Sequence, residues 1–263
     1  MDAVICCIAK FEGPYILEWV TYHLKLGFSK IYIFDNNNDK TRLRSYFTNR
    51  DYVSQQIANK VVLIHFPGNP AQMEAYEKFR INYSYKHTWV AILDCDEFIV
   101  LKKWEPITIF LSKFCKQGTL SLNWRLFGDS GRTNYSSEPV TQRFTLCESK
   151  LNCHVKSISV CKDIKYLNHP HMPELKNGYQ HDVNGTKING PFNNNNESLN
   201  IAYINHYFGK TREEWQIKKD RGKASGEMKR TDCEFDAHNF NEVEDLSAHN
   251  FYTDSSLNFF TSP

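Results

Sequence analysis

The first 93 residues alternate between short apolar segments and longer segments with helical periodicity. This alternation constrains the fold more than any other feature of the chain. Apolar, β-prone runs occur at residues 3–9, 31–34, 61–66 and 89–93. Helices are predicted between them, at residues 14–26, 41–50 and 70–86. This order is typical of a mostly parallel sheet with helices on both faces, so the sequence predicts an α/β fold.

The second half of the chain is less regular than the first. Three further strands are predicted, at residues 119–127, 143–147 and 156–160. Residues 211–222 are predicted to form a short helix, because Thr211 and Glu214 have the spacing of a capping box. The stretch from Asn168 to Ser198 is rich in His, Asn, Gly and Pro, and we expect it to form a surface loop or lid.

The sequence shows no internal repeat and no clear linker. We therefore expect one domain over residues 1–225 and a C-terminal tail over residues 226–263 that packs on it. The tail contains the aromatic run FYTDSSLNFF at residues 251–260. Contact with a membrane surface or with a second subunit is the alternative to packing on the domain.

Composition and charge narrow the class of function. The chain of 263 residues has a formal net charge of +2 and no long basic run, so nucleic acid is not an expected partner. Its eight cysteines form no C-x-x-C pair, which is typical of reduced thiols in the cytosol. The N-terminus does not resemble a signal peptide, and no stretch reaches the roughly 20 apolar residues of a membrane span. We expect a cytoplasmic protein, with peripheral contact at the inner face of a membrane left open and the oligomeric state unknown.

Polar side chains follow several predicted strands of the first half, at the point where each strand ends. Lys10 and Glu12 follow the first strand, Asp35 the second, and Asp94 and Asp96 the fourth. Open α/β sheets bind ligands outside the carboxyl ends of their strands. We therefore expect these side chains to line a ligand site.

The segment ILDCDEFIV (92–100) is the most distinctive part of that edge. The chain has no G-x-G-x-x-G after the first strand and no P-loop motif, so the phosphates of a bound nucleotide need another source of positive charge. A divalent cation held by carboxylates is one such source. In an extended stretch Asp94 and Asp96 project to one side and Cys95 to the other, and Glu97 is expected to order the loop or to pair with a cation. An isolated D-x-D is more often a turn or helix cap, but its place after the fourth strand favours a metal site.

Five segments, in order, resemble a group of GT-A-fold glycosyltransferases, the family-2-like and family-92-like enzymes. They are CCIAKFEGPYILEWVTYHLKLGFSKIYIFDNNN (6–38), WVAILDCDEFIV (89–100), LNWRLFGDSGR (122–132), VKSI (155–158) and INHYFGKTREEWQIKKDRG (204–222). The resemblance covers most of residues 3–222. The sequence departs from the family pattern at Phe11, where many relatives have Asn, and at Gln142, where Glu often precedes Arg-Phe.

The resemblance implies a GT-A fold over residues 1–225 and transfer of a sugar from a UDP-sugar, with inversion, to a hydroxyl of an acceptor. Galactose is the donor sugar suggested by the relatives, and a surface glycan or lipid-linked glycan is the expected acceptor. The implied cofactor is Mn²⁺ (or Mg²⁺), with Asp94, Asp96 and His206 as its ligands. A nitrogen ligand suits Mn²⁺ better than Mg²⁺.

The same resemblance places the nucleotide-sugar beside Lys10, Glu12, Asp35 and Asp94. As the glycosidic bond breaks, the diphosphate leaves with added negative charge. Two lysines, Lys156 and Lys210, are candidates to offset that charge together with the metal.

A carboxylate must also accept the proton of the attacking hydroxyl. Asp129 and Glu138 are the candidates for this base, with Asp182 as a further one. Trp124 and Phe127 are candidates for a sugar-stacking wall, although aromatic residues in a strand more often belong to the core.

Two other classes of function stay open. A metal-dependent nucleotidyltransferase or phosphodiesterase also gathers carboxylates around Mg²⁺, but often uses two metals and further acidic ligands. The chain has one compact acidic cluster. A non-catalytic carbohydrate-binding module with a decayed site is the second alternative. The presence of Asp94, Asp96 and His206 argues against such decay.

Overall fold

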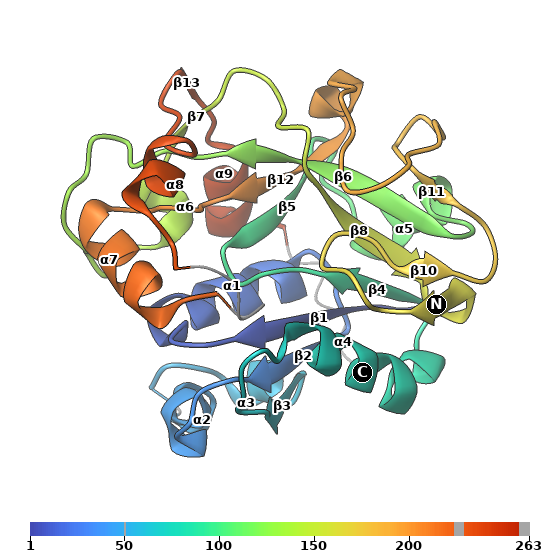
Figure 1. The fold of residues 1–263 in the computed structure, drawn as a ribbon, viewed down its shortest axis with the longest axis horizontal. Coiled ribbons are helices and arrows are strands. Elements are labelled where there is room, and N and C mark those ends of the chain that lie inside the picture. Colours follow the sequence, from blue (N-terminus) through green and yellow to red (C-terminus); the bar gives the residue numbers. More distant parts are fainter. Residues whose placement is uncertain (50, 224–228, 258–263) are drawn as a thin grey trace.

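The computed structural model describes residues 1–49, 51–223 and 229–257, and its largest element is a nine-stranded sheet (Figure 1). The strands follow the order β3-β2-β1-β4-β8-β6-β12-β5, and β11 pairs with β6 outside this path. They are β1 (Ala3–Ala9), β2 (Lys30–Asp35), β3 (Val61–His65), β4 (Trp89–Ile92), β5 (Glu97–Leu101), β6 (Thr119–Leu126), β8 (Val155–Val160), β11 (Gln180–His181) and β12 (Ala202–His206). Two small sheets pair β9 (Ile164–Tyr166) with β10 (Glu174–Leu175) and β7 (Leu146–Cys147) with β13 (Val243–Glu244).

The large sheet is mixed but mostly parallel. Strands β3, β2, β1 and β4 run parallel to one another, as do β11, β6 and β12. Strand β8 is antiparallel to both of its neighbours, and β5 is antiparallel to β12. The predicted α/β class is confirmed.

Helices cover both faces of this sheet (Figure 1). The α-helices are α1 (Gly13–Lys25), α2 (Lys40–Thr48), α3 (Gln55–Ala58), α4 (Gln72–Asn82), α5 (Ile107–Phe114), α6 (Val140–Arg143), α7 (Arg212–Arg221), α8 (Asp232–Asp236) and α9 (Ser247–Thr253). Short 3-10 turns are η1 (Ser84–Lys86), η2 (Cys161–Asp163) and η3 (Glu197–Asn200). None of the helices within the described ranges combines the length and the apolar character needed to cross a bilayer.

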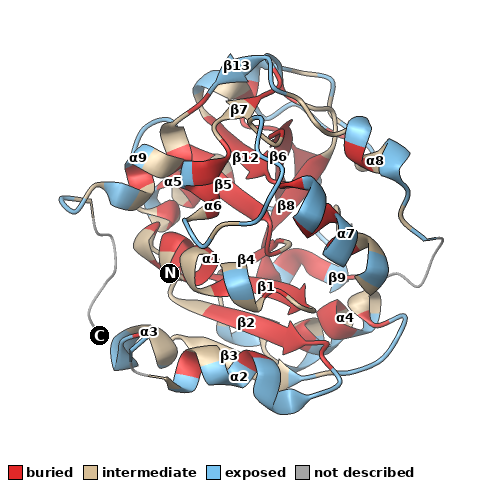
Figure 2. Ribbon diagram, turned by 90° about the vertical axis from the view of Figure 1, so that its left-hand side faces the viewer, coloured by how far each residue is buried: buried red, intermediate tan, exposed pale blue. Residues whose placement is uncertain are grey.

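Strand β1 shows why both faces are apolar. Every one of its residues is buried, because alternate side chains pack on opposite sides of the sheet. Ile5 and Cys7 belong to a core that includes Trp19 of α1, whereas Cys6 belongs to a second core that includes Phe79 of α4. The central strands β1, β4, β6, β8 and β12 are buried, and the outer surfaces of α2, α7 and α8 are exposed (Figure 2).

The segment ILDCDEFIV is not one strand, which corrects the expectation of an extended D-x-D. Strand β4 ends at Ile92, and β5 begins at Glu97 and pairs with β12. A turn lies between the two strands, where the N–H of Glu97 donates to the carbonyl of Asp94 at 3.1 Å. The Glu97 carboxylate closes the turn by accepting the N–H of Asp94 at 2.9 Å.

The predicted strand at residues 143–147 is wrong in its first half, because Arg143 ends helix α6. The carboxylate of Glu18, on α1, accepts the N–H groups of Val140 at 2.6 Å and Thr141 at 3.0 Å. These bonds satisfy donors that the start of a helix leaves unpaired. A tertiary contact therefore sets this helix, and only the end of the predicted run forms β7.

Residues 229–257 pack on the sheet and its helices. Strand β13 pairs with β7, and the buried ring of Phe251 on α9 lies edge-on to Tyr22 of α1, with ring centroids 5.1 Å apart. The last residues of the aromatic run, 258–260, lie outside the described residues, as do residues 226–228 of the predicted tail.

His23 is expected to make the stability of the fold depend on pH. The ring is fully buried, and burial lowers its pKa to about 3. The unfolded chain binds a proton near pH 6.5, so stability that is complete above this pH is lost as the pH falls toward 3, by up to about 1.4 kcal/mol per unit. Urea unfolding at pH 7.5, 6.0 and 5.0 measures the effect. The His23→Gln variant should show a shallower slope, and equal slopes would contradict the prediction.

Candidate functional site

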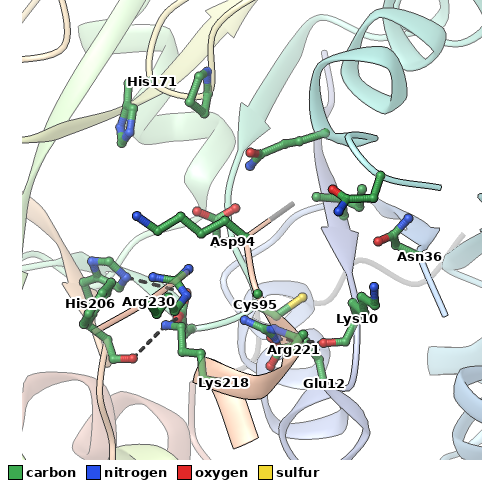
Figure 3. A pocket seen from close by; sticks show the side chains of 18 of the residues that line it. Lys10, Glu12, Asn36, Asp94, Cys95, His171, His206, Lys218, Arg221 and Arg230 are labelled. Atoms are coloured by element: carbon green, nitrogen blue, oxygen red, sulfur yellow. Dashed lines mark hydrogen bonds and ion pairs between the residues drawn. The ribbon is translucent and has the colours of Figure 1, made fainter. Parts of the chain in front are cut away.

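A cavity of about 240 Å³ lies where β1, β2, β4 and β12 end, and α7 forms one of its walls (Figure 3). Six of the predicted site residues line it together: Lys10, Glu12, Asp94, Asp96, Trp124 and His206. The polar ends of several strands therefore meet at one site, as expected for an open α/β sheet.

The first acid of the turn, Asp94, is held by a buried lysine. Lys156 is fully buried on β8 and donates to Asp94 Oδ2 at 2.8 Å, while Glu97 Oε2 lies 3.4 Å from the same ammonium. Burial would raise the pKa of Asp94, but the charge and the hydrogen bond of Lys156, together with His206, outweigh it and lower the pKa below its usual value. Burial raises the pKa of Glu97 well above its usual value, with Lys156 opposing. Lys156 thus neutralises and orients this turn from behind the cavity, whose lining it does not join.

The second acid, Asp96, has a different partner on each oxygen. Its Oδ2 accepts from Lys218 Nζ at 2.7 Å, and its Oδ1 lies 3.7 Å from His206 Nε2. Burial would raise the pKa of Asp96, but Lys218 and His206 hold it well below the usual value. Burial lowers the pKa of His206 to about 4, so the imidazole is neutral near pH 7. Its Nδ1 is buried without a hydrogen-bond partner.

The chemistry of Asp94, Asp96 and His206 fits a divalent cation, since two carboxylates and a neutral imidazole suit Mn²⁺. Their placement is not yet that of a closed site. Within the described parts of the chain, no three His, Cys, Asp or Glu side chains converge closely enough to hold a metal. At Asp96, Lys218 already bonds one carboxylate oxygen, so this oxygen is not available to a metal ion.

The orientation of Lys218 and Arg221 follows from how α7 begins. Thr211 and Glu214 form the predicted capping box, and Arg143 donates two hydrogen bonds of 2.9 Å to the Glu214 carboxylate. Both side chains of this ion pair are at most 2% exposed. With the first turn anchored, Lys218 and Arg221 lie three residues apart on the same side of the helix and line the cavity.

Cationic side chains outnumber acidic ones in the cavity lining. The cations are Lys10, Lys218, Arg221, Lys223 and Arg230, and the acids are Glu12, Asp94 and Asp96. Arg221 also donates to Glu12 and to the carbonyl of Lys10, which ties α7 to the end of β1. A concave site with surplus positive charge attracts an anionic ligand.

Aromatic and imidazole rings line another part of the cavity. Trp124 stacks on His154 with ring centroids 5.0 Å apart, and the ring centroids of Trp124 and His206 are 4.2 Å apart. His171 donates from Nδ1 to the carbonyl of Val155 at 2.8 Å. In the neutral ring its Nε2 is therefore an acceptor. Since neighbouring rings contact Trp124, its capacity to stack on a sugar is smaller than the sequence suggested.

Three other candidate residues lie outside this cavity. Asp35 is buried and lines a neighbouring cavity of about 330 Å³, where its Oδ2 has no hydrogen-bond partner. Lys210 lines a third cavity, with its ammonium 4.5 Å from the centre of the Tyr15 ring. Phe127 is buried and packs against Tyr207, with ring centroids 4.8 Å apart.

The three carboxylates predicted as catalytic bases do not line the cavity. Asp129 accepts from the side-chain amides of residues 239 and 241. Glu138 is exposed and pairs with Arg132 at 3.3 Å. Asp182 is buried and accepts the N–H groups of residues 184 and 186, so it closes its own turn. Each of the three has local structural partners.

Several lining residues were given no role in the site from the sequence. They are Asn36, Asn69, Gln72, His171, Lys218, Arg221, Lys223 and Arg230. A signal existed for two of them, because Lys218 and Arg221 have i, i+3 spacing in a helix that a capping box predicts. The amides and His171 lie in loops or at a helix start, where periodicity carries no signal.

A solved structure of a UDP-glucose pyrophosphorylase complexed with UDP-glucose is similar over 79% of this chain and 91% of that one. The sequence identity is 12% and the TM-score 0.36, which is too low to bear on fold or function.

Relatives in sequence are more informative. A glycosyltransferase family 92 protein of Ricinus communis is 24% identical over 229 residues, which cover 84% of this chain and 37% of that protein. Another, of Arabidopsis thaliana, is 23% identical over 196 residues, which cover 68% of this chain and 32% of that protein. The chain thus spans about a third of the length of these curated relatives. The family model of glycosyltransferase family 92 matches residues 2–237. The chain belongs to glycosyltransferase family 92.

Proposed function

We propose that this glycosyltransferase uses a UDP-sugar, with a divalent cation, and transfers the sugar to a hydroxyl of a glycan or lipid-linked glycan. The observation that carries the proposal is the composition of the cavity. Asp94 and Asp96 lie in one turn opposite a wall of lysines and arginines. This combination suits a ligand that brings a diphosphate and a metal ion together. Galactose as the donor sugar and Mn²⁺ as the ion are part of the proposal.

The residues of the cavity divide the tasks of donor binding. Asn69 and Gln72 offer side-chain amides to a nucleoside. Asn36 offers its Oδ1, because its NH2 group already donates to two backbone carbonyls. Lys218 and Arg221 offer charge to the diphosphate. A divalent cation bound by the acids would neutralise charge that develops on the leaving diphosphate.

The proposed reaction is a displacement at the anomeric carbon. The acceptor oxygen forms a bond to this carbon while the bond to the diphosphate oxygen breaks, the UDP takes the electron pair, and the configuration inverts. The acceptor proton passes to a base, for which Asp129, Glu138 and Asp182 remain predictions. Their position outside the cavity lining does not favour any of them.

UDP and Mn²⁺ together are expected to stabilise the protein against heat. Ligand at about 100 times its Kd adds about 2.7 kcal/mol, which corresponds to a rise in Tm of about 5–10 °C. The Asp96→Ala variant should lose the part of the shift that depends on Mn²⁺. The exposed Asp236, which pairs with Arg212 outside the cavity, provides the control variant Asp236→Ala. An unchanged Tm of the wild type would refute the proposed donor.

A second assay separates a transferase from a binding module and from a nucleotidyltransferase. Purified protein is incubated with Mn²⁺ and single UDP-sugars, and the release of UDP and of UMP is measured. Release of UDP, increased by acceptor glycans, supports transfer. Release of UMP supports cleavage between the phosphates, and no release supports a binding module.

A further inference from the structure

Lys218 bonds one oxygen of Asp96, which is one of the proposed metal ligands. Its ammonium donates to Asp96 Oδ2 and to the carbonyl of Phe208, both at 2.7 Å, and also lies 4.3 Å from the centre of the Phe208 ring. The other oxygen of Asp96 faces His206. Lys218 therefore balances a buried carboxylate that would otherwise be costly to keep ionised.

The two lysines of the acidic turn are not equivalent. Lys156 is fully buried behind the turn and lies near both Asp94 and Glu97. Lys218 lines the cavity itself, at the end of a long side chain with three flexible donors. Lys156 therefore lies away from a ligand in the cavity, whereas Lys218 borders the space that such a ligand would fill.

The neighbours of Lys218 favour its movement toward an anionic ligand. Four other cationic side chains, Lys10, Arg221, Lys223 and Arg230, line the same cavity. The ammonium thus lies among other cations, and a diphosphate in the cavity would relieve that repulsion.

We infer that Lys218 is an exchangeable counter-ion: it neutralises Asp96 while the donor site is empty, and on donor binding it leaves Asp96 to the divalent cation and moves its ammonium to the diphosphate. This inference rests on the proposed function. It explains why the candidate ligands do not form a closed metal site, because Asp96 is still paired with the lysine that lines the cavity. Lys218 then has two successive partners, Asp96 and the diphosphate, so its effects on Mn²⁺ binding and on UDP binding can be measured separately.

The test consists of two titrations. In the first, the protein is titrated with Mn²⁺ alone, and electron paramagnetic resonance measures the free ion. In the second, UDP is added at saturating Mn²⁺. Lys218→Met removes the competitor for Asp96, so we expect Mn²⁺ alone to bind about ten-fold tighter than to the wild type. The same variant lacks a phosphate partner, so UDP should bind about ten-fold more weakly. These opposite changes are not expected from a residue that only stabilises the fold.

Lys219 provides the matched control. It is adjacent in the chain but pairs with Asp232 outside the cavity lining, so Lys219→Met should leave both affinities unchanged. If Lys218→Met does not fold, Lys218→Arg keeps the charge and should bind Mn²⁺ alone no tighter than the wild type.

Three outcomes overturn the inference in distinguishable ways. If the wild type binds Mn²⁺ and Lys218→Met binds it no tighter, the exchange is refuted and the proposed function stands. Tighter Mn²⁺ binding by Lys218→Arg would also refute it, because the charge is retained. If the wild type shows no saturable Mn²⁺ binding, with or without UDP, the metal-dependent function fails and the inference fails with it.

Discussion

Replacing Asp96 by asparagine is expected to lower the rate of sugar transfer by about 10²- to 10³-fold, the range observed when one group that stabilises transition-state charge is removed. Asparagine has nearly the same shape, but it removes the negative charge that Lys218 and His206 approach from two sides. The divalent cation proposed for this site would lose a charged ligand. Initial rates of UDP release at saturating donor measure the effect.

Two controls make this result interpretable. Asp236→Asn carries the same substitution at an exposed position outside the cavity and should retain full activity. Thermal unfolding of Asp96→Asn shows whether the fold survives, since the substitution leaves the buried Lys218 without its carboxylate. A folded Asp96→Asn enzyme with a rate within three-fold of the wild type would contradict the role given to Asp96.

Replacing Arg143 by methionine is expected to reduce the free energy of unfolding by about 3–5 kcal/mol, the usual cost of removing one partner from a buried ion pair. Among the described residues, the donors left to the buried Glu214 carboxylate would all be neutral: the Tyr15 hydroxyl at 2.9 Å, the Thr211 hydroxyl at 2.7 Å and the Thr211 N–H at 3.2 Å. The methionine also cannot replace the bond from Arg143 Nε to the carbonyl of Glu138. Urea unfolding at pH 7 measures the loss.

Arg212 is the matched control, because its ion pair with Asp236 is exposed. Arg212→Met should change stability by no more than about 1 kcal/mol. In the double variant Arg143→Met/Glu214→Gln the buried charge is gone, so part of the lost stability should return. A loss below 1 kcal/mol for Arg143→Met would show that the pair does not anchor α7. A folded Arg143→Met protein should also bind UDP more weakly, because α7 carries Lys218 and Arg221.

Much of the fold could be predicted, because local signals and tertiary structure agree in the first half of the chain. β1 and α1 follow from an apolar run and from Pro14 at the start of a helix. The capping box at Thr211 likewise predicts the start of α7 correctly. The strand-end rule predicted that Lys10 and Asp96 would meet, although 86 positions separate them in the sequence.

The site was predicted less completely, because the same residue type can act in different ways. Lys156 was expected beside the diphosphate, but the structure buries it behind Asp94. Lys218, to which no role was given, instead reaches Asp96. Sequence spacing does not show which of two lysines points into a cavity, since that depends on how β8 and α7 pack against the acidic turn.

The sequence by itself determined the alternation of strands and helices, the carboxylates after the fourth strand and the family to which the chain belongs. Each of these depends on local pattern or on residue identity. Only the tertiary structure decided that the acids lie in a turn, that Glu18 caps α6, and that each acid faces its own lysine. These features depend on contacts between segments far apart in the chain, and on the need of every buried charge for a partner.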